Sequence, residues 1–75
     1  MKMKISDELC DRIISAASNR GFIGMGWAVT DEKGRPFASG APLEPGMFVA
    51  AENYYGYVVL RVNADMSLTE CERED

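Results

Sequence analysis

The sequence predicts an α+β domain, with an N-terminal helix packed on one face of a mainly antiparallel four- or five-stranded sheet made of two β-hairpins. Two observations predict this class. Apolar residues recur at helical spacing up to about residue 20, and from there they recur at every second position. Short clusters of Gly, Pro, Asn and Asp then divide the rest of the chain into strand-length segments. The length fits a single domain over residues 1–75.

The first predicted element is a helix over residues 6–20. Ser6 is a favourable N-cap, and the two acidic residues that follow it place negative charge in the first turn, where the helix dipole favours it. Ile5 and Cys10 have the spacing of a hydrophobic staple across this cap. Gly21 supplies a left-handed residue that ends the helix in a Schellman motif. The apolar stripe of the helix consists of Leu9, Cys10, Ile13, Ile14, Ala16 and Ala17.

The second predicted element is a strand over residues 22–30, followed by a turn. The bulky face of this strand carries Ile23, Met25, Trp27 and Val29, and the bare face carries Gly24, Gly26 and Ala28. We therefore expect a helix or another backbone to lie close over the bare face. Residues 31–34 predict a type I turn that ends in a left-handed Gly34. The return strand over residues 35–39 contains Pro36, so we expect it to be short and at a sheet edge.

The second half of the chain predicts two further strands. A loop over residues 40–46 is rich in Gly and Pro, and residues 47–53 fit either a short helix or a strand. Residues 55–62 are β-branched and aromatic, which predicts a strand with Val58, Leu60 and Val62 on one face and Tyr55, Tyr57, Val59 and Arg61 on the other. A last strand over residues 66–71 leads into an acidic tail, about residues 70–75, which we expect to be frayed.

The composition excludes most catalytic and metal-binding machinery. The chain has no histidine, which excludes Ser-His-Asp and Cys-His catalytic sets and imidazole ligands. Cys10 and Cys71 lack the close-paired spacing of zinc sites, and we expect two reduced, partly buried thiols rather than a disulfide. The glycines of residues 21–26 follow a helix instead of preceding one, the wrong order for a phosphate-binding loop. We predict no catalytic residues, no metal and no cofactor.

Charge and hydropathy narrow the classes of partner. The sequence has no apolar run of signal-peptide or membrane-helix length, so we expect a soluble, cytoplasmic protein with no membrane contact. Eight basic residues against 12 acidic residues give a net charge of −4, and the basic residues are scattered, which disfavours direct nucleic-acid binding. The acids are concentrated toward the C-terminus, at Asp65, Glu70, Glu72, Glu74 and Asp75.

Aromatic and acidic side chains supply the candidate contact residues. Tyr55 and Tyr57 share a predicted strand face with Arg61, a combination typical of protein interfaces, although a small protein also uses tyrosines to fill its core. Trp27 is flanked by apolar residues on its own face, which favours a core role, with an interface role as the alternative. The candidate protein-binding residues are Tyr55, Tyr57, Arg61 and Trp27, with Glu70, Glu72 and Glu74 steering toward a basic partner surface.

These features predict a small acidic non-enzymatic protein-binding module. The profile resembles, as a class and without any residue-level match, phage- or plasmid-encoded inhibitors, including some anti-CRISPR proteins. The sharpest form of the hypothesis is a stoichiometric inhibitor of a host nucleic-acid-binding complex, in which carboxylates compete with phosphate. The alternative is a self-associating structural or accessory subunit, a homodimer through the open sheet face or an edge strand. Area scaling gives a folded surface of roughly 4,600 Å² against roughly 12,000 Å² unfolded, so burial of only about 62% favours a partner in either case.

Overall fold

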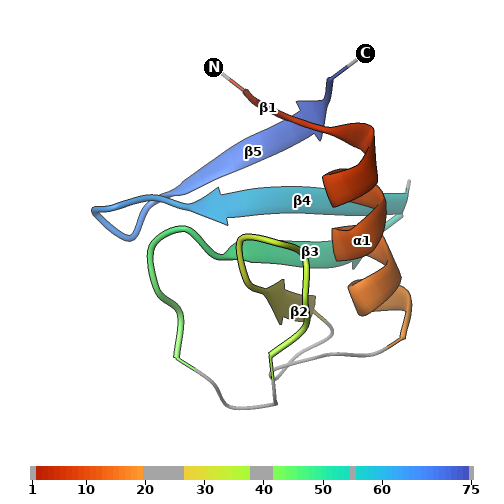
Figure 1. The fold of residues 1–75 in the computed structure, drawn as a ribbon, viewed down its shortest axis with the longest axis horizontal. Helices are drawn as coiled ribbons and strands as arrows, with labels where there is room; N and C mark the ends of the chain where they lie inside the picture. Colours follow the sequence, from red (N-terminus) through yellow and green to blue (C-terminus); the bar gives the residue numbers. More distant parts are fainter. Residues whose placement is uncertain (1, 20–26, 38–41, 55, 75) are drawn as a thin grey trace.

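A computed structural model describes residues 2–19, 27–37, 42–54 and 56–74. Within these residues, one helix packs on one face of a five-stranded, mostly antiparallel sheet, which confirms the predicted α+β class (Figure 1). The strand order is β1-β5-β4-β3-β2, and every neighbouring pair is antiparallel except β1 and β5. The elements are β1 (Met3–Ile5), α1 (Asp7–Ser18), β2 (Trp27–Thr30), β3 (Phe48–Asn53), β4 (Gly56–Val62) and β5 (Leu68–Arg73).

The start of α1 is the predicted one. The backbone N–H of Leu9 donates a hydrogen bond of 3.1 Å to the Ser6 side chain, which satisfies one of the donors left open in a first helical turn. Ile5 and Cys10 are both buried in one apolar cluster, as a hydrophobic staple requires. The helix runs across the strands and buries the predicted stripe against the sheet, at Cys10, Ile13, Ala16 and Ala17 (Figure 1).

The helix ends at Ser18, and the predicted helix end at Gly21 lies outside the described residues. The same holds for the first part of the strand predicted over residues 22–30, of which the structure describes Trp27–Thr30 as β2. Residues 47–53, which fit either a helix or a strand, contain β3. This strand lies inside the sheet, between β2 and β4.

The turn after β2 forms as predicted, and in the described part of the return strand, residues 35–37, the pairing with β2 is an isolated bridge. The carbonyl of Asp31 accepts the N–H of Gly34 at 3.0 Å, and Gly34 has a φ of 81°. Pro36 forms an isolated bridge with Thr30, and the N–H of Phe37 donates to the carbonyl of Val29 at 2.9 Å. Because proline has no N–H, the ladder cannot continue as a regular strand through this position.

The N-terminal strand β1 was not expected from the sequence. Met3–Ile5 pairs with β5 in parallel, with Met3 opposite Cys71 and Ile5 opposite Arg73. Three residues are too few to show a strand pattern, and their partner lies at the far end of the chain. With β1 in place, β5 is an inner strand that pairs on both sides.

This pairing corrects the expectation of a frayed acidic tail. Glu70 and Glu72 lie within β5, and the backbone N–H of Glu74 donates to the carbonyl of Ile5 at 2.8 Å. The tail is therefore hydrogen-bonded up to Glu74, because β1 supplies backbone partners that the sequence did not reveal.

The sheet carries an apolar cluster on each face. The cluster under α1 contains Ile5, Cys10, Ile13, Ala17, Ala28, Phe48, Ala50, Val59 and Cys71. Ala28, from the predicted bare face of β2, lies in this cluster, so the expectation of a closely packed neighbour is confirmed at this residue. The cluster on the opposite face contains Val29, Met47, Val49 and Val62, with Trp27, Phe37, Leu43 and Leu60 packed against it. Phe37 and Leu43 therefore cover part of the face that α1 leaves open.

Candidate protein-binding surface

The structure distributes the predicted contact residues over both faces of the sheet. Val59 of β4 packs under α1. Because every second side chain of a strand lies on the same face, Tyr57 and Arg61 also lie on the helix face. Trp27 packs against the cluster of the opposite face. Glu70 is opposite Leu60 in the β4–β5 register and shares that opposite face. The predicted set is thus divided between two surfaces.

Tyr57 and Arg61 both have partners within the chain. The Tyr57 hydroxyl lies 3.1 Å from the Ser18 hydroxyl at the end of α1, and 36% of the tyrosine is exposed. Arg61 is partly buried, and its Nη1 donates to the Met3 sulfur at 3.6 Å. These contacts tie β4 to the end of α1 and to β1. Tyr55 lies outside the described residues, so the tyrosine–arginine patch stays a prediction.

The face opposite α1 carries a row of apolar side chains across three strands. Trp27 is opposite Ala51, Ala51 is opposite Val58, and Leu60 follows two residues later on the same face of β4. We call Trp27, Ala51, Val58 and Leu60 the apolar strip. All four are partly exposed, whereas Val29, Val49 and Val62 on the same face are buried. The strip therefore borders the covered cluster and extends it toward solvent.

A row of ion pairs flanks the apolar strip. The Lys2 ammonium lies 3.5 Å from the Glu70 carboxylate, and the Lys4 ammonium lies 3.3 Å from the Glu72 carboxylate, across β1 and β5. We call these four residues the charged ladder. The ladder borders the strip because Glu70 is opposite Leu60. The pairs are half-exposed, and exposed pairs of this kind contribute at most about 1 kcal/mol each, so their main effect is to cancel charge.

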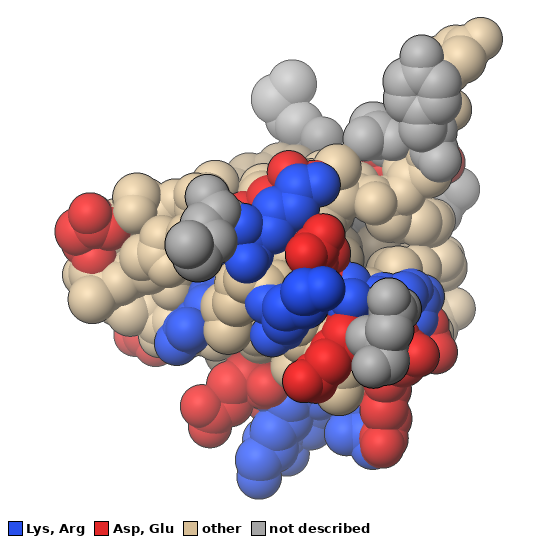
Figure 2. Space-filling model, turned by 90° about the horizontal axis from the view of Figure 1, so that it is seen from above, with Lys and Arg blue, Asp and Glu red and all other residues tan. Residues whose placement is uncertain are grey.

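The ladder places basic groups beside part of the acidic C-terminal segment. Figure 2, which looks onto the β1 edge of the molecule, shows basic and acidic side chains interleaved. On the helix face, the Arg73 guanidinium lies 2.6 Å from Asp11 and 3.6 Å from Asp7. Glu74 is exposed beyond the end of β5. Of the acids that cluster near the C-terminus in the sequence, Glu70 and Glu72 therefore lie beside basic groups in space.

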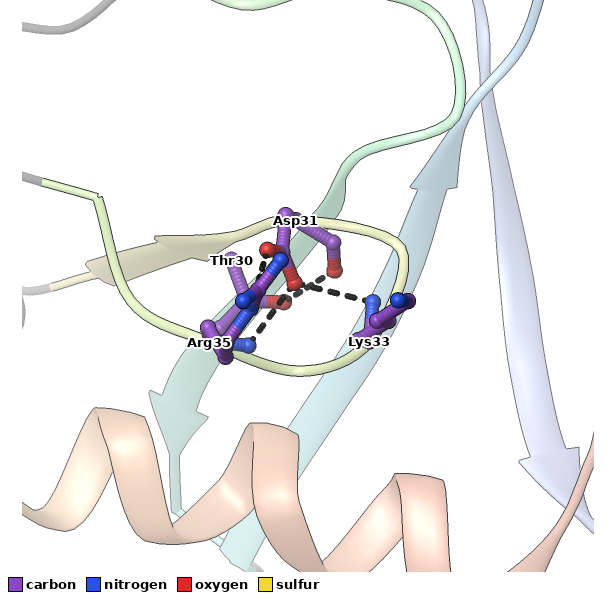
Figure 3. Close-up of polar contacts among 4 residues, drawn as sticks. All are labelled: Thr30, Asp31, Lys33 and Arg35. Atoms are coloured by element: carbon purple, nitrogen blue, oxygen red, sulfur yellow. Dashed lines mark hydrogen bonds and ion pairs between the residues drawn. The ribbon is translucent and has the colours of Figure 1, made fainter.

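Asp31 organises the turn after β2 (Figure 3). Its carboxylate accepts the backbone N–H groups of Lys33 and Arg35 at 2.8 and 2.9 Å, and Arg35 Nε lies 2.8 Å from its second oxygen. Desolvation raises the pKa of Asp31, but these hydrogen bonds and the guanidinium charge outweigh it and hold the pKa below its ordinary value. All of these interactions are local, which is the pattern of a structural turn.

A groove of about 540 Å³ runs between the outer face of α1 and this turn. Its lining includes Glu8, Arg12, Arg35 and Pro36. The charges that line it are engaged within the chain, since Arg12 pairs with Glu8 and Arg35 pairs with Asp31. The charged side chains that line the groove are therefore not free to orient a charged ligand.

The thiols, the acidic side chains and the helix of the described residues can each be set against what redox, metal and membrane-spanning sites require. Cys10 and Cys71 are free and buried, and burial raises the pKa of both thiols, which opposes thiolate formation. No group of three or more Cys, Asp or Glu side chains in the described ranges is placed to hold a metal ion. Within the same ranges, no helix has the length and apolar character needed to cross a membrane.

Sequence reasoning missed part of this surface. It grouped Val58 with Leu60 on one strand face, but it assigned the contact role to the other face of that strand. It also left Lys2 and Lys4 without a role, because a strand of three residues carries almost no periodic signal. Comparisons with protein families, curated proteins and solved structures found no match for this chain.

Proposed function

We propose that the protein is a small non-enzymatic protein-binding module that contacts its partner through the apolar strip. The observation that carries the proposal is the strip itself, a row of four apolar side chains left partly exposed on the sheet face that α1 does not cover. An apolar centre with a polar margin is the usual anatomy of a protein interface. Trp27 is the type of residue that dominates binding energy at such centres.

The ladder supplies the polar margin in this proposal. Glu70 and Glu72, which the sequence marks as contact residues, keep that role as members of the ladder. Tyr57 and Arg61 act instead as internal ties between β4, the end of α1 and β1, as their hydrogen bonds indicate. A partner that lies on the strip would not touch these two side chains, because they are on the other face of β4.

The narrower hypothesis, an inhibitor that competes with phosphate, is supported only by the acidic composition of the chain. Phosphate mimicry needs carboxylates gathered without counter-charges. Glu70 and Glu72 each lie beside a lysine, and Asp7 and Asp11 lie beside Arg73. A phage- or plasmid-type inhibitor of a nucleic-acid-binding complex therefore stays a prediction from the net charge.

The test compares two variants with the same charge change. Val58→Glu places a carboxylate in the strip, and Lys33→Gln removes a charge from the exposed turn tip, so each lowers the net charge by one. An affinity-tagged chain is expressed together with an untagged copy, and all captured proteins, including the untagged copy, are quantified by mass spectrometry. We expect Val58→Glu to lower capture of the partner at least about tenfold, the equivalent of about 1.4 kcal/mol.

Lys33→Gln should capture the partner as the unmodified chain does, and circular dichroism should show that both variants are folded. Capture that is the same for Val58→Glu and the unmodified chain would remove the strip as the contact surface. Capture of no protein at all, neither the untagged copy nor any other, would remove the binding function.

A further inference from the structure

The charges of the ladder, which flanks the apolar strip, sum to zero in a molecule that is acidic as a whole. The ladder contains two lysines and two glutamates, whereas the chain carries a net charge of −4. A partner with a basic surface would be steered by unpaired carboxylates at the margin of the contact. The ladder does not provide them. A partner that is itself acidic meets less repulsion at this neutral margin than at a margin of unpaired carboxylates.

Both edges of the sheet carry features that disfavour strand addition by a second chain. The outer edge strand β1 is only three residues long, contains Lys4 and is preceded by Lys2. Short length and lysines are both features that protect edges. The outer edge of β2 is occupied at Val29 and Thr30 by the chain around Pro36. Association of two copies by edge-to-edge pairing is therefore disfavoured, and the sheet face is the remaining surface of the sheet.

The surface opposite α1 extends over the whole width of the sheet. The molecule exposes 4957 Å², above the roughly 4,600 Å² that area scaling gives for a monomer of this mass. A specific interface needs about 600 Å² from each partner at its lower limit. The strip, the ladder and Leu68, which is 49% exposed and pairs with Val62 at the end of β4, lie on one face and extend over all five strands.

From these three features we infer that the partner at the apolar strip is a second copy of this chain, packed sheet face to sheet face about a two-fold axis. The inference rests on the proposed function and names its partner. Two sheets packed in this way lie about 10 Å apart and interleave the side chains of their inner faces. The neutral ladder of each copy lets two acidic molecules approach, and each Trp27 loses its contact with solvent.

The test measures self-association of the purified chain by sedimentation equilibrium, from about 1 µM to about 500 µM, a range that brackets a micromolar dissociation constant. We expect a reversible monomer–dimer equilibrium. Val58→Glu should raise the dissociation constant at least about tenfold, and Lys33→Gln should leave it unchanged. Higher salt should leave the dimer equally stable or make it more stable, because it screens the repulsion between two copies of charge −4.

A second measurement needs no variant. Trp27 is the only tryptophan of the chain, so its fluorescence reports on the strip directly. Dilution of the unmodified protein should shift the emission to longer wavelength as the dimer dissociates and Trp27 meets water. The concentration at the midpoint of this shift should agree with the dissociation constant from sedimentation.

The outcomes separate the inference from the proposed function. A chain that stays monomeric at the highest concentration overturns the inference. Val58-dependent capture of a different protein would then leave the proposed function standing. A dimer that Val58→Glu does not weaken, or that forms without any change in Trp27 emission, places the contact elsewhere and also overturns the inference. A dimer that dissociates on addition of salt contradicts the argument from charge.

Discussion

Gly34 is the position at which a single methyl group should cost the most for its size. The turn after β2 lies directly on α1, and Gly34 has a φ of 81°. A Cβ atom built at this position would lie 2.8 Å from the Cβ of Arg12 and 3.4 Å from the Cδ1 of Leu9. Gly34→Ala therefore combines two costs, a left-handed backbone for an L side chain and a steric conflict with the helix.

The two costs can be separated with a matched variant. A left-handed backbone costs an alanine about 1–2 kcal/mol. Forcing a methyl group into a packed site costs about 1–3 kcal/mol more. Gly46 has a φ of 93°, but a Cβ there would have no heavy atom within 4 Å beyond its chain neighbours, so Gly46→Ala measures the backbone cost alone.

We expect Gly34→Ala to lower the free energy of unfolding by about 2–5 kcal/mol and Gly46→Ala by about 1–2 kcal/mol. A domain of this size is stable by only about 4–11 kcal/mol, so the first loss is a large fraction of the total. Equilibrium unfolding in urea, followed by Trp27 fluorescence and by circular dichroism, measures both variants. Equal losses for the two variants would refute the close packing of the turn on α1.

A third variant sharpens the comparison. Gly34→Asn keeps a residue type that tolerates the left-handed conformation but still adds a Cβ atom. It should recover part of the backbone cost and none of the steric cost. A Gly34→Asn protein as stable as the unmodified chain would show that Arg12 and Leu9 move aside at no cost, contrary to the contacts described for this turn.

Three further predictions concern the helix cap, the turn carboxylate and the thiols. Ser6→Ala removes the acceptor of the Leu9 N–H and should lower the free energy of unfolding, measured in urea, by about 1 kcal/mol. A loss near zero would contradict this cap. The pKa of Asp31 is lowered on folding, so its contribution to stability is present above its ordinary pKa of 3.8 and is lost as the pH falls through the folded value. Below pH 4, the free energy of unfolding of Asp31→Asn should therefore depend less on pH than that of the unmodified chain. Because they are buried and their pKa is raised, Cys10 and Cys71 should react slowly with iodoacetamide in the native state and rapidly in urea. Mass spectrometry counts the alkylated thiols over time.

The helix could be predicted because its signals are local. Ser6 and the acidic residues after it mark the start of α1, and the apolar stripe lies within a few turns of the same segment. β1 could not be predicted in the same way. Its stability comes from pairing Met3 with Cys71, a contact between the two ends of the chain, and three residues carry almost no periodic signal.

The candidate surface was only partly predictable because both faces of β4 are apolar at their centre. Val58 and Leu60 lie on one face and Val59 on the other, so the strand pattern alone does not say which face α1 covers. The neighbouring strands decide this question. Ala28 and Ala50 are small and lie on the helix face, where the helix packs closely over the sheet. The strip is on the face where the larger Trp27 stands.

β1 links the fold to the proposed function, since it determines the charge of the surface beside the strip. Without β1, Glu70 and Glu72 would lie on an edge strand without their lysines, and the strip would border an acidic margin suited to a basic partner. With β1 in place, the same carboxylates belong to a neutral ladder, and the outer edge of the sheet is a strand of three residues. The short parallel strand β1 thus disfavours strand addition. It also lowers the electrostatic repulsion that an acidic partner meets at the open face. Both consequences favour the second copy of the chain over a basic protein at the apolar strip.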